Sequence, residues 1–284
     1  MKPVAFAYFA PRTVDAALDL LAEYGDEGKV LAGGQSLVPA MNFRLARPAS
    51  LIDINRVAGL DYVREEGGAL CIGALARHAR FETPVTGGPL GEFLPRVAHH
   101  IAHLPIRARG TFCGSVAHAD PASEWCLVAA TLDAEMVVAS RRGTRTLRPD
   151  DYFVTALTTA LEPDELLTEI RLPLLGPEWR TGFVEFSRRA GDYALAACAA
   201  ALRIEDGYIV EARIGIGGAT DRPSRITAAE DALVGTDGDA AARREAASIV
   251  AETIDPLEDV QASGAYRRDL VRAMVERAVA QALA

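Results

Sequence analysis

The stretch VLAGGQSLVPAMNFRLARP, residues 30–48, takes a short apolar strand into two adjacent glycines, an amide and a hydroxyl. Gly33 and Gly34 allow the backbone to turn with positive φ and to approach another group closely, because glycine has no Cβ. The stretch fits two structures: a plain tight turn, or a turn whose backbone N–H groups bind an anion. Taken alone, it gives the two alternatives even weight.

A second stretch of the same kind, TFCGS at residues 111–115, favours the anion-binding alternative. We expect Gly114 to lie in a turn of its own, separate from that of Gly34, and each glycine is followed by small polar side chains. Such turns expose N–H groups that bind an oxyanion without needing a positive charge. We therefore predict a diphosphate held between the two turns, with further hydrogen bonds from the side chains of Gln35, Ser36, Thr111 and Ser115. The chain lacks the G-x-x-x-x-G-K-[ST] and G-x-G-x-x-G motifs of other phosphate-binding loops.

Length and composition exclude several classes of protein. The 284 residues predict about two domains. No uninterrupted apolar run of about 18 residues is present, so no transmembrane span is expected. The apolar run at the N-terminus is broken by Pro11 and Arg12, which predicts a cytoplasmic protein without a signal peptide. The net charge of −9 argues against nucleic-acid binding.

The residue types that bind metals are scattered along the chain. The four cysteines form no C-x-x-C pair, and the five histidines lack metal-like spacing. We therefore expect no metal site, no iron–sulfur cluster within this chain and no disulfide framework.

The apolar pattern predicts a β-α-β-β start followed by a largely antiparallel region. Thr13 is a predicted N-cap of a helix that ends at Gly25, and strands are predicted at 29–34 and 51–54. Further along, a hairpin turns at Gly67-Gly68. Helical stretches are predicted near 77–83 and 90–103, and from an N-cap at Asp120 to about Leu132.

The last third of the chain reads as a linker, a sheet and helices. The linker is predicted at 175–182, and three strands at 182–189, 194–204 and 208–218. The final helix carries an apolar stripe that indicates core packing, with partner binding as the alternative. The stripe consists of Leu270, Val271, Met274, Val275, Ala278 and Val279.

Three stretches together resemble the medium, FAD-binding subunit of the molybdenum hydroxylases, the family of carbon monoxide dehydrogenase, aldehyde oxidase and xanthine dehydrogenase. They are AGGQSLVPAMNFRLARPASLIDI (32–54), RGTFCGSVAHADPASE (109–124) and FSRRAGDYALA (186–196). The resemblance implies an α+β fold with a flavin domain of the p-cresol methylhydroxylase or vanillyl-alcohol-oxidase type. That domain would span 1–176, with α/β subdomains of about 1–56 and 57–176. A C-terminal domain at 177–284 would hold a three-stranded antiparallel sheet and helices.

The resemblance also implies a set of FAD-binding residues. Those expected near the diphosphate are Ala32, Gly33, Gly34, Gln35, Ser36, Thr111, Phe112, Cys113, Gly114 and Ser115, and Leu37 is a further expected contact with the cofactor. Those expected near the ribityl or ribose hydroxyls are Asp120 and Glu124; the apolar contacts are Ile101 and Leu167; and Tyr193 would lie beside the isoalloxazine.

The chain departs from the family pattern in two places. Cys113 replaces the first glycine of T-[IL]-G-G-[SND], so the position must accept a side chain or be strained. Upstream, Pro105 and Ala108 replace a Gln and an Asn that relatives often carry. A redox role for Cys113 competes with a small buried residue, which we favour. For Tyr193, a flavin gate competes with a tyrosine packed between domains.

The function implied by the resemblance is electron transfer within an oxidoreductase complex. A large subunit with a molybdenum cofactor and a small subunit with [2Fe-2S] clusters would be the partners, in a dimer of heterotrimers. Non-covalent FAD in this chain would pass electrons to NAD, a quinone or O2. A self-contained flavin oxidase is the alternative, weakened because no histidine that could link FAD precedes His78. A scaffold without flavin is a third alternative, opposed by the intact glycine motifs.

Overall fold

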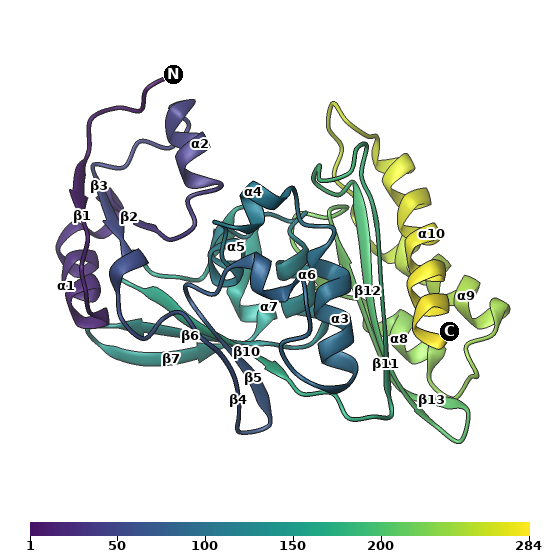
Figure 1. Cartoon of the computed structure of the whole chain (residues 1–284). Coiled ribbons are helices and arrows are strands. Elements are labelled where there is room, and N and C mark those ends of the chain that lie inside the picture. Colours follow the sequence, from purple (N-terminus) through teal and green to yellow (C-terminus); the bar gives the residue numbers. More distant parts are fainter.

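The chain begins with a small parallel sheet (Figure 1). The computed structural model describes residues 1–284, and the strand order here is β1-β3-β2. The predicted first helix is confirmed: Thr13 Oγ1 accepts a hydrogen bond from the Ala16 N–H at 3.2 Å, and Gly25 ends the helix. The elements are β1 (Ala7–Phe9), α1 (Val14–Tyr24), a 3-10 turn (Gly25–Glu27), β2 (Gly28–Leu31), α2 (Leu37–Asn42), β3 (Ser50–Asp53) and a second 3-10 turn (Ile54–Arg56).

The predicted β-α-β-β order is wrong in one respect, because α2 lies between β2 and β3. These two strands are parallel neighbours. Parallel strands cannot be joined by a tight turn and need a crossover connection. The connection here carries the first glycine motif and α2, which places that motif at the carboxyl end of β2.

The second part of the chain is a five-stranded antiparallel sheet covered by short helices. Its order is β4-β5-β10-β6-β7. The predicted hairpin is confirmed, since Gly67 and Gly68 join β4 to β5 with φ of 59° and 80°, the positive values that a two-residue hairpin turn requires. The elements are β4 (Val63–Glu66), β5 (Ala69–Gly73), a 3-10 turn (His78–Phe81), α3 (Gly88–Ala98), α4 (Leu104–Arg107), α5 (Phe112–His118), α6 (Glu124–Thr131), β6 (Glu135–Ser140), β7 (Gly143–Leu147), α7 (Pro149–Tyr152), β8 (Phe153–Thr155), β9 (Thr158–Thr159) and β10 (Leu166–Pro173).

The C-terminal part holds a four-stranded antiparallel sheet, not a three-stranded one, in the order β11-β12-β13-β14. The fourth strand pairs with Gly215 and Ile216 of β13 and has only two residues, too few to give a periodic signal in the sequence. The predicted linker is also too long, because β11 starts before its end. The elements are β11 (Trp179–Phe186), β12 (Ala196–Glu205), β13 (Tyr208–Gly217), β14 (Ser224–Arg225), α8 (Thr227–Leu233), α9 (Ala240–Thr253) and α10 (Gly264–Leu283).

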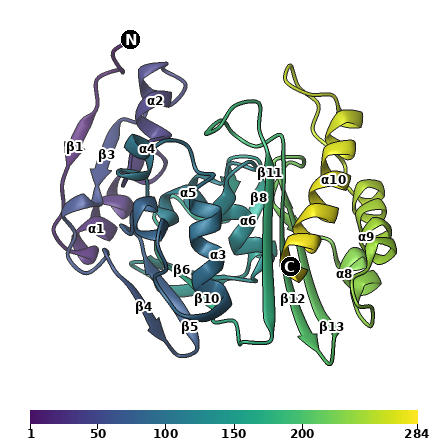
Figure 2. The same ribbon diagram turned by 45° about the vertical axis from the view of Figure 1, so that its right-hand side comes forward.

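The four-stranded sheet separates two hydrophobic cores. Alternate residues of β12 point to opposite faces, so that Ala197, Ala199 and Ala201 join the larger core, which contains α3 and α6. The intervening residues face the smaller core beneath α8, α9 and α10. Figure 2 shows α3 and α6 on one side of this sheet and the C-terminal helices on the other. The apolar stripe of α10 is buried in the smaller core, which confirms core packing.

None of the helices combines the length and apolar character needed to cross a bilayer.

Candidate functional site

The first glycine motif forms a concave turn between β2 and α2. Gly34 has a φ of 72°, the left-handed region that favours glycine. The four consecutive N–H groups of residues 33–36 donate no hydrogen bond to any acceptor in the chain. Ser36 occupies the N-cap position of α2 without making a side-chain capping bond, and Leu37 is the first residue of that helix. A run of unpaired, neighbouring donors is the arrangement that binds the oxygens of a phosphate group.

The second motif is not a turn of its own, as predicted, but the first turn of α5. Thr111 caps this helix, because its Oγ1 accepts a hydrogen bond from the Gly114 N–H at 3.0 Å. The Phe112 N–H donates to Ala76 O at 3.0 Å. Of the first three helical N–H groups, only that of Cys113 is left without a partner. A Cβ on Gly114 would lie 2.5 Å from Thr111 Oγ1, so glycine is required here by the cap itself.

The fold brings the two motifs into direct backbone contact. A Cβ on Gly33 would lie 2.5 Å from Arg109 O and 2.6 Å from the Cα of Gly110, the residue that precedes Thr111. Both atoms belong to the backbone and cannot rotate away. The two stretches therefore lie side by side, although Gly33 and Thr111 are 78 positions apart in the sequence.

A hydrogen-bonded bridge of two side chains holds these stretches together. Asn55 Nδ2 donates to Ala32 O at 2.8 Å, and Asn55 Oδ1 accepts from Arg77 Nη2 at 2.6 Å. Arg77 Nη1 donates in turn to Arg109 O. Sequence reasoning missed both residues. A signal for Asn55 was present, since it follows a strand predicted beside the glycine turn, and the carboxyl ends of parallel strands meet at one edge.

The turn before α6 places acidic and hydroxyl groups beside the second motif. Asp120 does not cap α6, contrary to the prediction. Its Oδ1 accepts from the Ala122 N–H at 2.9 Å, and the cap is Ser123, whose Oγ accepts from the Cys126 N–H at 3.4 Å. The Ser115 and Ser123 hydroxyls are 2.8 Å apart. The cap lies three residues later because Pro121 starts a turn instead of a helix.

Glu124, at the start of α6, is a buried acid whose carboxylate makes no hydrogen bond to another residue. It is 8% exposed, and burial, with a smaller contribution from the charge of Asp120, raises its pKa to about 7. Glu185 on β11 lies close enough to Glu124 for the two charges to interact, and its Oε2 is buried without a hydrogen-bond partner. Burial, with a smaller contribution from the charge of Glu124, raises the pKa of Glu185 to about 9. Sequence reasoning missed Glu185, for which a single acid in a strand gives no signal.

Tyr193 lies in the loop between β11 and β12, residues 187–195, and is near Ser36 of the first motif. Tyr193 is 61% exposed. Desolvation of its hydroxyl and then the charge of Asp120 raise its pKa, while a hydrogen bond with the Ser36 side chain lowers it. Nearby, Gly191 packs so closely on His103 that a Cβ would lie 2.5 Å from the imidazole Cε1. Ser36, Asp120 and Glu124 all act on the pKa of Tyr193, so these four side chains lie within electrostatic reach of one another.

Four other predicted residues have side chains in the larger hydrophobic core. Phe112 stacks on Trp125 with ring centroids 4.5 Å apart. Ile101 and Leu167 are buried in the same cluster. Cys113 is 2% exposed and lies in a helix with ordinary φ, so the position is not strained. Burial raises the pKa of its thiol, which opposes redox reactivity at this position.

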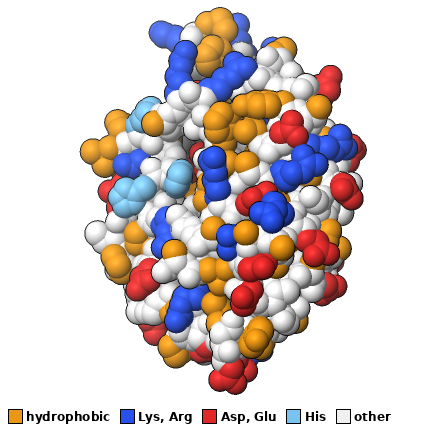
Figure 3. All heavy atoms as spheres, turned by 90° about the vertical axis from the view of Figure 1, so that its right-hand side faces the viewer, with side chains coloured by type: hydrophobic (Ala, Val, Ile, Leu, Met, Phe, Trp, Pro, Cys, Tyr) orange, Lys and Arg blue, Asp and Glu red, His pale blue; other side chains and the backbone are white.

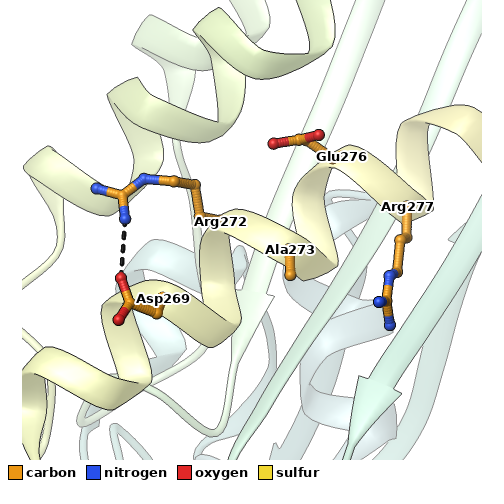
Figure 4. A pocket seen from close by; sticks show the side chains of 5 residues that line it. All are labelled: Asp269, Arg272, Ala273, Glu276 and Arg277. Carbon is orange, nitrogen blue, oxygen red and sulfur yellow. Dashed lines mark hydrogen bonds and ion pairs between the residues drawn. The ribbon is translucent and has the colours of Figure 1, made fainter. Parts of the chain in front are cut away.

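A separate hollow lies on the outer surface of α10 (Figure 4). Its lining is Asp269, Arg272, Ala273, Glu276 and Arg277. Asp269 and Arg272 pair with each other at 3.0 Å, and no buried polar group points into the hollow. Acidic and basic side chains are interspersed over this whole face of the molecule (Figure 3). We find no binding chemistry there.

Comparisons with known proteins show which family the chain resembles. Residues 4–175 match the family described as "FAD binding domain in molybdopterin dehydrogenase", and residues 182–282 match the "CO dehydrogenase flavoprotein C-terminal domain". The chain is 40% identical over 284 residues to the 6-hydroxypseudooxynicotine dehydrogenase complex subunit alpha of Paenarthrobacter nicotinovorans, covering 100% of this chain and 96% of that protein. It is 38% identical to the nicotine 6-hydroxylase medium subunit of the same organism, covering 99% of each. Among solved structures, carbon monoxide dehydrogenase from Hydrogenophaga pseudoflava superimposes with a TM-score of 0.95 at 34% identity, covering 99% of this chain and 98% of that one.

Proposed function

Because this chain belongs to the family of FAD-binding medium subunits of the molybdopterin dehydrogenases, we propose that it binds one FAD non-covalently against the turn at residues 32–36. The observation that carries this proposal is the run of four unpaired N–H groups in that turn. These donors suit a diphosphate in a chain whose net charge is −9, because the backbone attracts the anion locally without a cationic side chain.

The residues of the site fit the remaining parts of FAD. Carboxylates accept hydrogen bonds from hydroxyls, so Asp120 and Glu124 would bind the ribityl or ribose hydroxyls. Tyr193 would cover the isoalloxazine, since an aromatic ring contributes a large contact area at low entropic cost. The diphosphate would be bound by Ala32, Gly33, Gly34, Gln35, Ser36 and Leu37, and by the turn Thr111, Phe112, Cys113, Gly114 and Ser115. Ile101 and Leu167 would contribute to the apolar wall.

The proposed activity is electron transfer within a complex of several subunits. When bound, FAD supplies storage for two electrons and exchange between one-electron and two-electron steps. The electrons would come from a molybdenum-containing large subunit through a small [2Fe-2S] subunit. They would pass to an external acceptor: NAD⁺, a quinone or O2. A dimer of such heterotrimers is the proposed assembly, and the subunit names of the relatives support a complex.

The two family matches support the proposed division of the chain. We place the FAD-binding domain, of the vanillyl-alcohol-oxidase type, at 1–176, with subdomains of about 1–56 and 57–176, and the C-terminal domain at 177–284. The strand β11 begins at Trp179, close to this boundary. Each part has its own sheet, and the FAD site would lie where the three parts meet.

The experiment that tests this function is purification of the native assembly with analysis of its metals and flavin. We expect the chain to co-purify with two other subunits, molybdenum and iron, and its flavin to be reduced when the substrate of the complex is added. The alternative is a self-contained flavin oxidase. A chain that purifies alone and reduces its own flavin with a substrate would establish that alternative and overturn the proposal.

A further inference from the structure

Arg267 is a charged side chain buried within α10, on the far side of the four-stranded sheet from most of the site. It is 3% exposed. Its Nη1 donates to Leu195 O at 2.7 Å and to Gly218 O at 2.8 Å, and its Nη2 donates to Asp259 Oδ2 at 2.7 Å. Hydrogen bonds from a guanidinium are stronger than those between neutral groups, and a buried charge strongly resists losing them. The positions of these three acceptors are therefore coupled.

Two of these acceptors adjoin the proposed flavin site. Leu195 is two residues after Tyr193 and ends the loop between β11 and β12. Gly218 follows β13, and its N–H donates to Pro121 O at 2.7 Å, beside Asp120. The Arg267 guanidinium thus connects the loop at 187–195, called here the tyrosine loop, with the turn at 120–123, although it touches neither Tyr193 nor Asp120.

The loop at 255–263, between α9 and α10, binds the tyrosine loop at a residue that precedes Tyr193. Arg188 Nη2 donates to Gln261 O at 2.5 Å. Asp259 Oδ1 accepts from the Gln261 and Ala262 N–H groups at 2.8 and 3.0 Å, which fixes the shape of this segment. Figures 1 and 2 show the two loops at the same end of the four-stranded sheet. The tyrosine loop is therefore held on both sides of Tyr193.

We propose that Arg267 is a positioning residue that holds Tyr193 over the flavin, with Arg188 as the second point of attachment. The proposal rests on the proposed function, because the position of Tyr193 matters only if a flavin lies beside it. Arg267 acts through Leu195 O, and the tyrosine ring then limits which molecules reach the flavin.

The test is a double-mutant cycle between Arg267 and Tyr193 in the FAD-loaded complex. Arg267→Met keeps most of the apolar stem in the core and removes the hydrogen bonds. The complex is reduced with dithionite and mixed with O2, and the return of the flavin absorption band gives the rate of reoxidation. The shape of that band and the rate of FAD release on dilution provide readouts besides activity.

We expect both Arg267→Met and Tyr193→Ala to accelerate reoxidation several-fold and to alter the flavin band. In the Tyr193→Ala background, Arg267→Met should have no further effect, because residues that act through one another are not additive. Arg267→Lys should restore part of the wild-type rate, since an ammonium can donate to the same carbonyls. A merely structural role would give the same change in both tyrosine backgrounds.

Arg188→Ala decides the question if Arg267→Met does not fold, because Arg188 is exposed and its loss leaves the core intact. It should also accelerate reoxidation. Arg189→Ala is its matched control, because Arg189 is also exposed and its side chain makes no hydrogen bond. Additive effects of Arg267→Met and Tyr193→Ala would overturn this inference but not the proposed function. So would unchanged reoxidation in both Arg267→Met and Arg188→Ala when each complex holds its full content of FAD. A wild-type complex without FAD would instead overturn the proposed function.

Discussion

Gly33 and Gly110 lie in direct contact, so close that a Cβ on Gly33 would approach the Gly110 Cα to 2.6 Å. The contact joins the end of β2 to the segment that starts α5. It exists because Gly33 lacks a side chain; a Cβ on Gly110 would instead meet the imidazole of His78, 2.5 Å from its Nε2. The proposed diphosphate site depends on this contact, since it brings the free N–H groups of 33–36 beside the second motif.

Gly33→Ala should separate the two motifs. The added methyl would meet backbone atoms of Arg109 and Gly110 that cannot rotate away. Overpacking of this kind costs about 1–3 kcal/mol of stability, and the displaced turn should lose most of its affinity for FAD. FAD content and urea unfolding check the two effects. Gly87→Ala is the control, because a Cβ there meets nothing within 4 Å and the φ is not positive; equal FAD content in both variants would contradict the prediction.

Gly114→Ala should weaken the fold as well as FAD binding. A Cβ at this position would lie 2.5 Å from Thr111 Oγ1 and would disrupt the cap of α5. Loss of an N-cap costs about 1 kcal/mol. Thr111→Val, which removes the same cap, should lower the unfolding free energy by a similar amount. If Gly114→Ala lost FAD with no change in stability, glycine would be needed here for the ligand and not for the cap.

Glu185→Gln should make stability less dependent on pH. The folded state raises the pKa of this acid to about 9, well above that of an exposed glutamate, so the folded protein binds the proton more tightly than the unfolded chain. The stabilisation is complete below about pH 4.5 and is lost as the pH rises toward 9. The neutral glutamine cannot ionise, so the variant should gain stability relative to the wild type between pH 5 and pH 9, by about 1.4 kcal/mol for each pH unit between the two pKa values.

Urea unfolding at pH 5, 7 and 9 measures this difference, with fluorescence of the buried Trp125 and Trp179 as the signal. Glu92→Gln, at an exposed position of α3, serves as the control. If the difference in unfolding free energy between Glu185→Gln and the wild type stays constant over this range, the pKa of Glu185 is not raised in the folded protein.

Tyr193→Ala should leave FAD bound but change its reaction with the acceptor. The exposed tyrosine lies near enough to Ser36 for that side chain to lower its pKa, which suits a cover over a flavin bound at the turn 32–36. We expect faster reoxidation by O2, while reduction from the molybdenum side changes much less, because those electrons arrive through the partner subunits. Stopped-flow measurement of both half-reactions checks this, and unchanged reoxidation by every acceptor would leave Tyr193 as a domain-interface residue.

Sequence reasoning located most of the longer strands, the first motif and the family, because these depend on local patterns. Apolar alternation and the pair Gly67-Gly68 are enough to predict a hairpin. The two-residue strand β14 and the displaced cap at Ser123 could not be predicted, since each depends on contacts with distant residues. The second motif was misread for a related reason: in sequence, a glycine beside a capping threonine looks the same as a glycine in a turn.

The site was predicted in part. The residues of the two motifs and Tyr193 could be named because they lie within recognisable stretches. Glu185 and Arg77 belong to no motif, and only the folded chain shows where they lie; Asn55 also belongs to no motif, but its place after a predicted strand was a signal that was missed. Arg267 was least accessible to sequence reasoning, since its role depends on backbone carbonyls that belong to other elements.

The most direct test of the central claim is the identity and attachment of the flavin in the purified native complex. We predict that acid precipitation releases all yellow colour into the supernatant, as intact FAD at one per chain, because the turn at 32–36 binds a diphosphate without a covalent bond. Colour retained in the protein pellet, or FMN in place of FAD, would contradict the account.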